Sequence, residues 1–250
     1  MDNWTSNHWK TFFSIYEKIL RQGPGDNNST VRALKTFMDL PQDTRILEVG
    51  CGTGVQSIEL AKNLGLESEV WATEMHSPFI DILNNKIKKE NITNLKALTM
   101  DMCNIEAPKN YFDLIWAEGS IYFYGFENAL KDWKEYFRGK ARFAFTEPNW
   151  FKKDIPDKAK EVWQGYEICS IEETSKRIKE LGYNLLDCFK LPSTAWSQNY
   201  YEPLQKELDK NSNNFLDSEA KEVIDSIKKE INDYKLYGEY YGYTFYICEG

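Results

Sequence analysis

Residues 46–54 read I-L-E-V-G-C-G-T-G, a short apolar run that ends in glycines at three alternate positions, Gly50, Gly52 and Gly54. A helical pattern of apolar residues follows over residues 55–64. Glycine lets the backbone pass close to a ligand, and the N-terminus of a helix offers free N–H groups. The stretch therefore predicts a buried strand, a turn that cradles a nucleotide, and a helix.

The spacing of the glycines bears on which nucleotide binds. The dinucleotide fingerprint is G-x-G-x-x-G/A, and its third glycine position is occupied here by Val55. Glu48, at the end of the strand, suits a cationic amine and repels a pyrophosphate. An NAD-dependent oxidoreductase is therefore the less favoured alternative, and a titration with NADH distinguishes it.

Two later strands also end in acidic residues. Residues 70–74 form a predicted strand that ends in Glu74, and residues 97–102 form another that carries Asp101 near its end. Each acid alone has a plain alternative interpretation, a solvated strand end. Together with Glu48, these two acids lie in register with the glycine turn, which favours one ligand site at the carboxyl edge of a parallel sheet.

The stretch E-V-G-C-G-T-G resembles the first motif of the class I S-adenosylmethionine-dependent methyltransferases. The resemblance implies S-adenosylmethionine as the cofactor. It places the glycine turn beside the methionine part of the donor, Glu74 at the ribose and Asp101 at the adenine. The residues assigned to the donor are Arg21, Gln22, Glu48, Gly50, Cys51, Gly52, Gly54, Glu74, Met75, Asp101, Met102 and Glu118.

The resemblance extends to a branch of this family. Residues 112–122 read F-D-L-I-W-A-E-G-S-I-Y, which is similar to the fourth-strand motif of ubiquinone/menaquinone-methyltransferase-like enzymes. A bacterial subgroup of unassigned substrate shares this motif, R-Q-G-P-G at 21–25 and Y-Y-G-Y-T-F at 240–245. The N-P-P-Y-type sequence of nucleic-acid amino-methylating enzymes is absent from this position. The resemblance implies the fold and the cofactor, and it leaves the acceptor open.

Composition restricts the partners and the compartment. The chain has 250 residues and a formal net charge of −8, which argues for one core and against a nucleic-acid partner. Its start is acidic and polar, and no apolar run is long enough to cross a membrane. Five scattered cysteines and two histidines offer no recognisable metal site, so we expect free thiols, no metal and a cytoplasmic location.

Predicted strands and helices alternate along the chain, which indicates right-handed βαβ units. We expect a Rossmann-like α/β fold with a seven-stranded, mostly parallel sheet, helices on both faces, an N-terminal helical lid and a C-terminal helical insertion. The last strand is expected to be antiparallel and inserted between the fifth and sixth. We treat 1–250 as one domain with N-terminal helices (1–40), a donor-binding core (41–150) and substrate-side elements (151–250).

The predicted helices span residues 9–20, 31–40, 55–64, 77–90, 128–137, 170–181, 202–210 and 216–234. Ser29 or Thr30 is the expected cap of the second helix. The helix 216–234 has an apolar stripe that could pair with a second copy of the chain, so a homodimer is one possibility. His8 is expected on the surface of the first helix, and His76 at the edge of the adenosine.

Methyl transfer is an in-line displacement, which requires positioning and exclusion of water but no covalent enzyme intermediate. Glu118 and Tyr122, at the tip of the fourth strand, are the candidate catalytic residues. Glu118 would contact the acceptor or act as a base; alternatively, it holds the neighbouring loop. No other general base stands out, and a thiol or an amine of low pKa needs none.

Aromatic residues make up 15% of the chain, and several follow strand ends on the ligand side. Trp150, Trp196 and Tyr200 are the candidates for an acceptor pocket, and near Glu118 and Glu147 they would suit a cationic or planar small molecule. The alternative for each is that it fills the core.

We therefore predict a methyltransferase that acts on a small molecule. A module that binds S-adenosylmethionine without catalysis remains the second hypothesis, because positioning catalysis leaves no nucleophile in the sequence.

Overall fold

The computed structural model describes residues 4–211 and 217–250. Its centre is one sheet with the strand order β3-β2-β1-β4-β5-β8-β7, and the two-residue β6 pairs with β5 beside this path. The strands are β1 (Arg45–Val49), β2 (Glu69–Glu74), β3 (Leu95–Thr99), β4 (Leu114–Ala117), β5 (Arg142–Trp150), β6 (Cys169–Ser170), β7 (Asn184–Lys190) and β8 (Tyr241–Glu249). The Rossmann-like α/β fold is confirmed.

The register of the sheet agrees with the expected topology. β1 runs parallel to β2 and β4, while β8 is antiparallel to both of its neighbours, β5 and β7. The strand order therefore reverses between β1 and β4. In an open α/β sheet, ligands bind beyond the carboxyl ends of the strands at this point.

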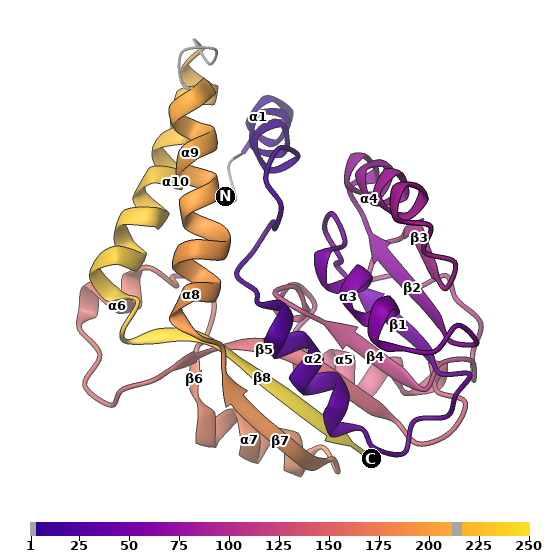
Figure 1. Ribbon diagram of the computed structural model, residues 1–250. Helices are drawn as coiled ribbons and strands as arrows, with labels where there is room; N and C mark the ends of the chain where they lie inside the picture. Colours follow the sequence, from indigo (N-terminus) through magenta and orange to yellow (C-terminus); the bar gives the residue numbers. More distant parts are fainter. Residues whose placement is uncertain (1–3, 212–216) are drawn as a thin grey trace.

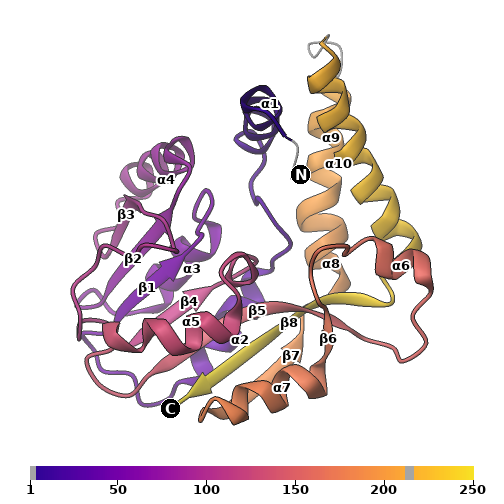
Figure 2. The ribbon, with the colours of Figure 1, turned by 180° about the vertical axis from the view of Figure 1, so that it is seen from behind.

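Helices cover both faces of the sheet (Figures 1 and 2). The helices are α1 (Ser6–Tyr16), α2 (Asn27–Thr36), α3 (Val55–Asn63), α4 (Ser77–Glu90), α5 (Phe126–Asp132), α6 (Asp157–Glu161), α7 (Ile171–Glu180), α8 (Ser193–Trp196), α9 (Glu202–Asn211) and α10 (Ser218–Tyr237), with the short helical turns η1 (Ile121–Phe123), η2 (Trp133–Tyr136) and η3 (Ser197–Tyr201). One buried cluster joins the sheet to α2, α3 and α4, and a second joins it to α5 and α7.

The first helix, α1, packs against α9 and α10 above the sheet. Figure 1 shows α9 and α10 extending beyond the carboxyl ends of the strands, with α1 between them and α4. Apolar side chains of α10 such as Val223, Ile227 and Ile231 are buried within the chain, in the same cluster as side chains of α1 and α9. The described part of this helix therefore lacks the exposed apolar stripe on which the homodimer prediction rested. Leu216 lies outside the described residues.

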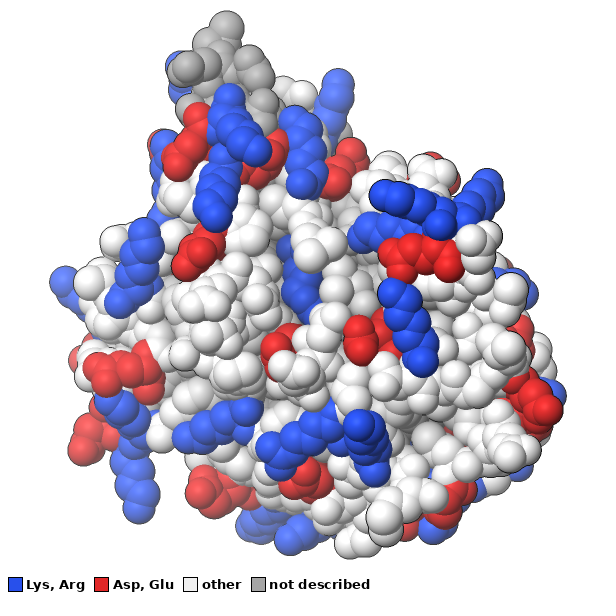
Figure 3. Space-filling model, viewed as in Figure 1, with Lys and Arg blue, Asp and Glu red and all other residues white. Residues whose placement is uncertain are grey.

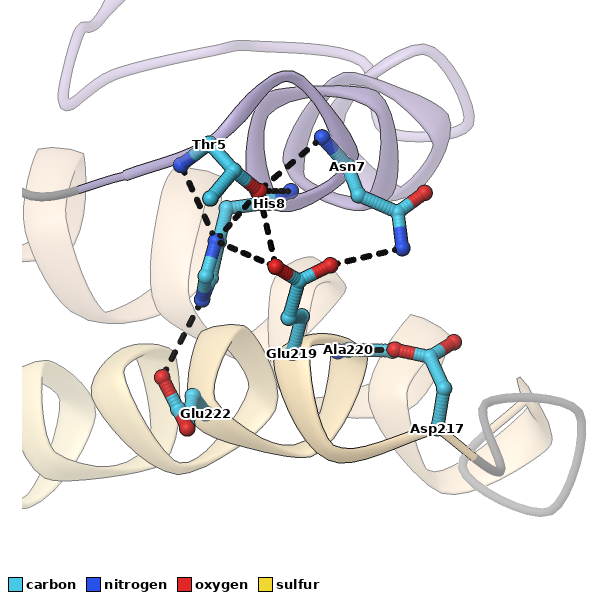
Figure 4. A network of polar contacts seen from close by, with 7 residues as sticks. All are labelled: Thr5, Asn7, His8, Asp217, Glu219, Ala220 and Glu222. Atoms are coloured by element: carbon cyan, nitrogen blue, oxygen red, sulfur yellow. Dashed lines mark hydrogen bonds and ion pairs between the residues drawn. The ribbon is translucent and has the colours of Figure 1, made fainter.

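His8 joins α1 to α10, and its predicted surface position is wrong. The residue is 5% exposed, and its Nε2 lies 3.1 Å from a carboxylate oxygen of Glu222. Its Nδ1 contacts the Thr5 hydroxyl at 3.0 Å, while Asn7 donates to Glu219 at 2.9 Å. Figure 4 shows these polar contacts between the two helices.

The caps explain where the first two helices begin. Thr5 and His8 form a capping box, so α1 starts at Ser6 and not at Trp9. The carboxylate of Asp26 accepts from Ser29 N at 2.9 Å, so α2 starts four residues before the predicted point. The predicted caps at Ser29 and Thr30 are therefore wrong, because an acidic cap lies upstream of both.

The surface carries both signs of charge. On the face shown in Figure 3, basic and acidic side chains are interspersed over the described residues. Across the described ranges, no helix is both long enough and apolar enough to span a bilayer.

Candidate functional site

The glycine turn follows β1 at the carboxyl edge of the sheet. Gly50, Gly52 and Gly54 have φ angles of 70°, 54° and 77°, in the left-handed region that side chains rarely adopt. Cys51 is buried in this turn, and its N–H donates to Thr73 O at 2.9 Å. The sequence therefore uses glycine here both for conformation and for close approach.

A segment from the N-terminus is bonded to the same turn. Gln22 accepts from Thr53 N at 2.8 Å and donates to Tyr16 O and Ile19 O, both at 3.0 Å. Lys86 of α4 donates to Thr53 O at 2.8 Å. Gln22 was predicted to contact the donor. Both polar atoms of its side-chain amide instead form hydrogen bonds within the protein. Gln22 is placed to hold the turn in shape.

Glu74 lies at the end of β2, as predicted, and faces the glycine turn. Its carboxylate accepts from Gly52 N at 3.2 Å and from His76 N at 3.0 Å. Met75 follows it and is 66% exposed. His76 is stacked on Phe13 with ring centroids 3.8 Å apart, which brings α1 against this edge.

The third strand ends earlier than predicted. β3 stops at Thr99, so Asp101 lies in the loop that follows, where its carboxylate accepts from Cys103 N at 2.8 Å. The Met102 methyl group lies 3.3 Å from the point where a Cβ on Gly50 would stand. The loop after β3 thus returns to the glycine turn.

Three charged side chains are buried beneath the turn. Glu48 is fully buried, and neither carboxylate oxygen accepts a hydrogen bond from a described residue. Burial raises its pKa to about 8, the neighbouring Ser57 and Gln56 side chains and the charge of Arg21 oppose that rise, and Glu118 adds to it. Burial also lowers the pKa of Arg21, against the opposing effect of Glu118.

Hydrogen bonds from the described residues reach only one of the two carboxylate oxygens of Glu118. One oxygen accepts from the Thr30 hydroxyl at 2.7 Å and from Trp116 Nε1 at 2.9 Å. The other oxygen is buried without a partner among the described residues. Burial raises the pKa of Glu118, and Arg21 lowers it. Orphaned buried carboxylates beside a buried guanidinium fit an amino-acid zwitterion, which carries one ammonium and one carboxylate.

A group of tyrosines adjoins this charged site. Tyr16 and Tyr200 have their hydroxyl oxygens 3.0 Å apart, and Tyr243 donates to the Tyr122 hydroxyl at 3.3 Å. Burial raises the pKa of Tyr122 to about 12. We call Tyr16, Tyr122, Tyr200, Tyr201, Tyr241 and Tyr243 the tyrosine cluster.

The two predicted tryptophans surround this cluster. Trp196 is 5% exposed and stacks on Tyr234, with its ring centroid also 4.7 Å from that of Tyr243. Trp150 lies edge to face with Tyr241 at 6.2 Å. Both pack behind the tyrosines, so they shape the wall of the cluster.

Glu147 of β5 is the remaining buried acid on this side. Tyr166 donates to one of its oxygens, the other oxygen has no described partner, and burial raises its pKa to about 8. A cavity of about 160 Å³, lined in part by Glu147 and Arg177, adjoins it.

Tyr16, Tyr243 and Glu230 were not among the site residues predicted from the sequence. The last of these has a signal in the sequence, because Glu230 stands on the apolar stripe of α10 between Ile227 and Tyr234. A charge at such a position is uncommon. Within the described ranges, no group of three His, Cys, Asp or Glu side chains is arranged to hold a metal ion.

Residues 46–140 match the family model of a methyltransferase domain, Methyltransf_25. EEF1A lysine methyltransferase 2 of Homo sapiens is 24% identical over 193 residues, which cover 69% of this chain and 78% of that protein. Demethylmenaquinone methyltransferase of Geobacillus sp. (strain WCH70) is 28% identical over 40% of this chain. The match spans about half, 47%, of that bacterial protein.

Solved structures share the fold over nearly the whole chain. A methyltransferase from Geobacter sulfurreducens in complex with S-adenosylhomocysteine has a TM-score of 0.79 at 16% identity, and it covers 95% of this chain and 96% of its own. YjhP from E. coli has a TM-score of 0.80 at 16% identity over 96% of this chain and 98% of its own. Residues 46–140 therefore carry a methyltransferase domain that uses S-adenosylmethionine, and the solved structures share the fold of nearly the whole chain.

Proposed function

We propose that the protein transfers a methyl group from S-adenosylmethionine to a small-molecule acceptor, and that catalysis depends mainly on positioning. The observation that carries the proposal is the junction of two sites. The glycine turn and its buried charges adjoin a largely buried tyrosine cluster, because Tyr16 O accepts from the same Gln22 that holds Thr53 N. A small molecule can reach buried side chains of this kind more readily than a folded polymer can.

The donor site follows from the charges. Arg21 would hold the donor carboxylate, and the free oxygens of Glu48 and Glu118 would hold its ammonium. Glu74 would accept from the ribose hydroxyls, with Met75, Asp101 and Met102 beside the adenosine. Gly50, Cys51, Gly52 and Gly54 would pass along the methionine part, with Gln22 fixing their shape.

When bound, S-adenosylmethionine supplies an electrophilic methyl group. Glu118 would orient the donor at the tip of β4, and Tyr122 would orient the acceptor next to it. Trp196, Tyr200 and Trp150 would exclude water from the acceptor side. The likeness to the ubiquinone/menaquinone-methyltransferase-like branch, carried by the motif at residues 112–122, supports the proposal without naming an acceptor.

Protein lysine is a second candidate acceptor, because the human relative that aligns over 69% of the chain is named for lysine methylation of EEF1A. The test is transfer of a labelled methyl group into small-molecule, protein and RNA fractions of the source cells. We expect label in one low-mass compound. Label in protein would favour the lysine candidate, and label in RNA would contradict both. A protein that binds the donor and labels no fraction would contradict the catalytic proposal.

Replacing Glu74 by alanine should weaken donor binding by about 1–3 kcal/mol, because a carboxylate that accepts charge-assisted hydrogen bonds from both ribose hydroxyls is lost. Calorimetric titration with S-adenosylhomocysteine measures the effect. Glu69→Ala, at the opposite end of β2, is the matched control and should leave the affinity unchanged. Equal affinities of the two variants would contradict the assigned ribose site.

A further inference from the structure

Glu230 is a carboxylate on the apolar side of α10. It shares the stripe with Val223, Ile227 and Tyr234, of which the first two are buried. Tyr201 donates a hydrogen bond to one oxygen of Glu230 at 3.0 Å. This hydrogen bond holds the Glu230 carboxylate beside the tyrosine cluster, although the residue is exposed to solvent.

Glu230 lies where the tyrosine cluster meets solvent, because the residue is exposed while most of the tyrosines are buried. Its surroundings raise its pKa, and hydrogen bonds from Tyr201 and Tyr200 oppose that rise by stabilising the carboxylate. A ligand that approaches from the solvent would therefore meet an accessible carboxylate flanked by the hydroxyl groups of these two tyrosines.

Hydrogen bonds connect the tyrosines beside Glu230 to the glycine turn. Tyr200 lies 3.0 Å from Tyr16, hydroxyl to hydroxyl, and the Tyr16 carbonyl accepts from Gln22, which holds the glycine turn. On the other side, the Tyr243 ring lies 3.6 Å from the point where a Cβ on Gly119 would stand, directly after Glu118. The cluster thus extends from Glu230 to the tip of β4.

The charges around the cluster have one sign. Glu230 raises the pKa of all six hydroxyls, and Glu147 does the same for Tyr122 and Tyr243. Such surroundings disfavour a carboxylate or phosphate and favour a cation. Tyrosine ring faces attract cations as well.

We propose that the acceptor is an organic amine, which binds as its ammonium ion between Glu230 and the rings of the tyrosine cluster. The inference rests on the proposed methyl transfer and names its acceptor class. The ammonium first gives a proton to the Glu230 carboxylate, which frees the lone pair of the nitrogen. The nitrogen then bonds to the methyl carbon, while the sulfur–methyl bond breaks and its electron pair stays on sulfur.

The test is calorimetric titration of the full chain saturated with S-adenosylhomocysteine, which prevents turnover. The probes are phenethylamine, 2-phenylethanol and phenylacetate, which share a ring and differ in charge. We expect the amine to bind more tightly than either analogue. Glu230→Gln should weaken amine binding by about 10-fold or more, since a charge-assisted contact is lost. Asp225→Asn, which removes one charge from the same helix, should leave it unchanged.

Three results would overturn the inference: phenylacetate binding as tightly as the amine, no binding of the amine, or unchanged amine affinity in Glu230→Gln. The affinity for S-adenosylhomocysteine, measured first in each variant, reports folding and the donor site independently. If the wild-type protein did not bind S-adenosylhomocysteine at all, that result would contradict the proposed function itself.

Discussion

Gly50→Ala should lower the affinity for S-adenosylhomocysteine by about 100-fold, equivalent to about 3 kcal/mol of strain and overlap. Gly50 has a φ of 70°, and a Cβ there would overlap the Cβ of Ser120, whose hydroxyl is bonded to Val49 O at 2.7 Å. The turn must therefore move, and the donor side must move with it. Calorimetric titration measures the affinity.

Gly23→Ala is the matched control for this variant. No described heavy atom lies within 4 Å of the point where its Cβ would stand, and its φ is not in the left-handed region. This variant should bind S-adenosylhomocysteine like the wild type. If Gly50→Ala did the same, the glycine turn would not be the element that approaches the donor.

Glu48→Gln should stabilise the donor-free protein and weaken donor binding at the same time. The pKa of Glu48 is raised from 4.5 to about 8, so between these values the folded state holds a proton that the unfolded state has released. Stability from this group is therefore present below pH 4.5 and is lost as the pH rises to about 8. Glutamine stays neutral, and at pH 8 we expect a gain of about 1–3 kcal/mol in the free energy of unfolding.

Donor affinity should change in the opposite sense. In the wild type it should rise with pH as Glu48 loses its proton and becomes a counter-charge for the donor ammonium. In Glu48→Gln it should be about 10- to 100-fold weaker at high pH, with that rise removed. Urea unfolding and calorimetric titration across the pH range measure both effects.

The variant Glu147→Gln distinguishes the effect on the free energy of unfolding from the effect on donor affinity. Glu147 is the other buried carboxylate whose pKa burial raises to about 8, and it lies on β5 beside the cavity instead of under the glycine turn. This variant should share the gain in stability and keep the donor affinity. If both variants lost donor affinity, the role of Glu48 as the counter-charge of the donor ammonium would be contradicted.

The sequence was sufficient for the sheet and the glycine turn because both depend on local patterns. The glycine turn, the helix after it and the acid at the end of β2 are contiguous in residues 45–74, and the strand order follows from alternation and handedness. Where prediction was wrong, a neighbouring polar group had been overlooked. Asp26 moved the start of α2, and Thr5 moved that of α1.

The tyrosine cluster and Glu230 could not be predicted in the same way, because these residues come from distant parts of the chain. Tyr16, Tyr122 and Glu230 belong to α1, η1 and α10, and no periodicity relates them. His8 illustrates the same point: its environment is set by Glu222, which lies 214 positions away. Long-range contacts between polar groups leave a trace in the sequence only when a charge interrupts an apolar stripe, as Glu230 does.

The packing of α1 against α10 joins segments that are far apart in the sequence, which bears on the order in which the nascent protein folds. The donor-side elements from β1 to β4 are complete when about half of the chain has left the ribosome, whereas α10 and β8 emerge last. The contact between α1 and α10 can therefore form only after α10 has been synthesised. The tyrosine cluster, which includes residues of α1 and β8, is for the same reason among the last parts of this fold to assemble.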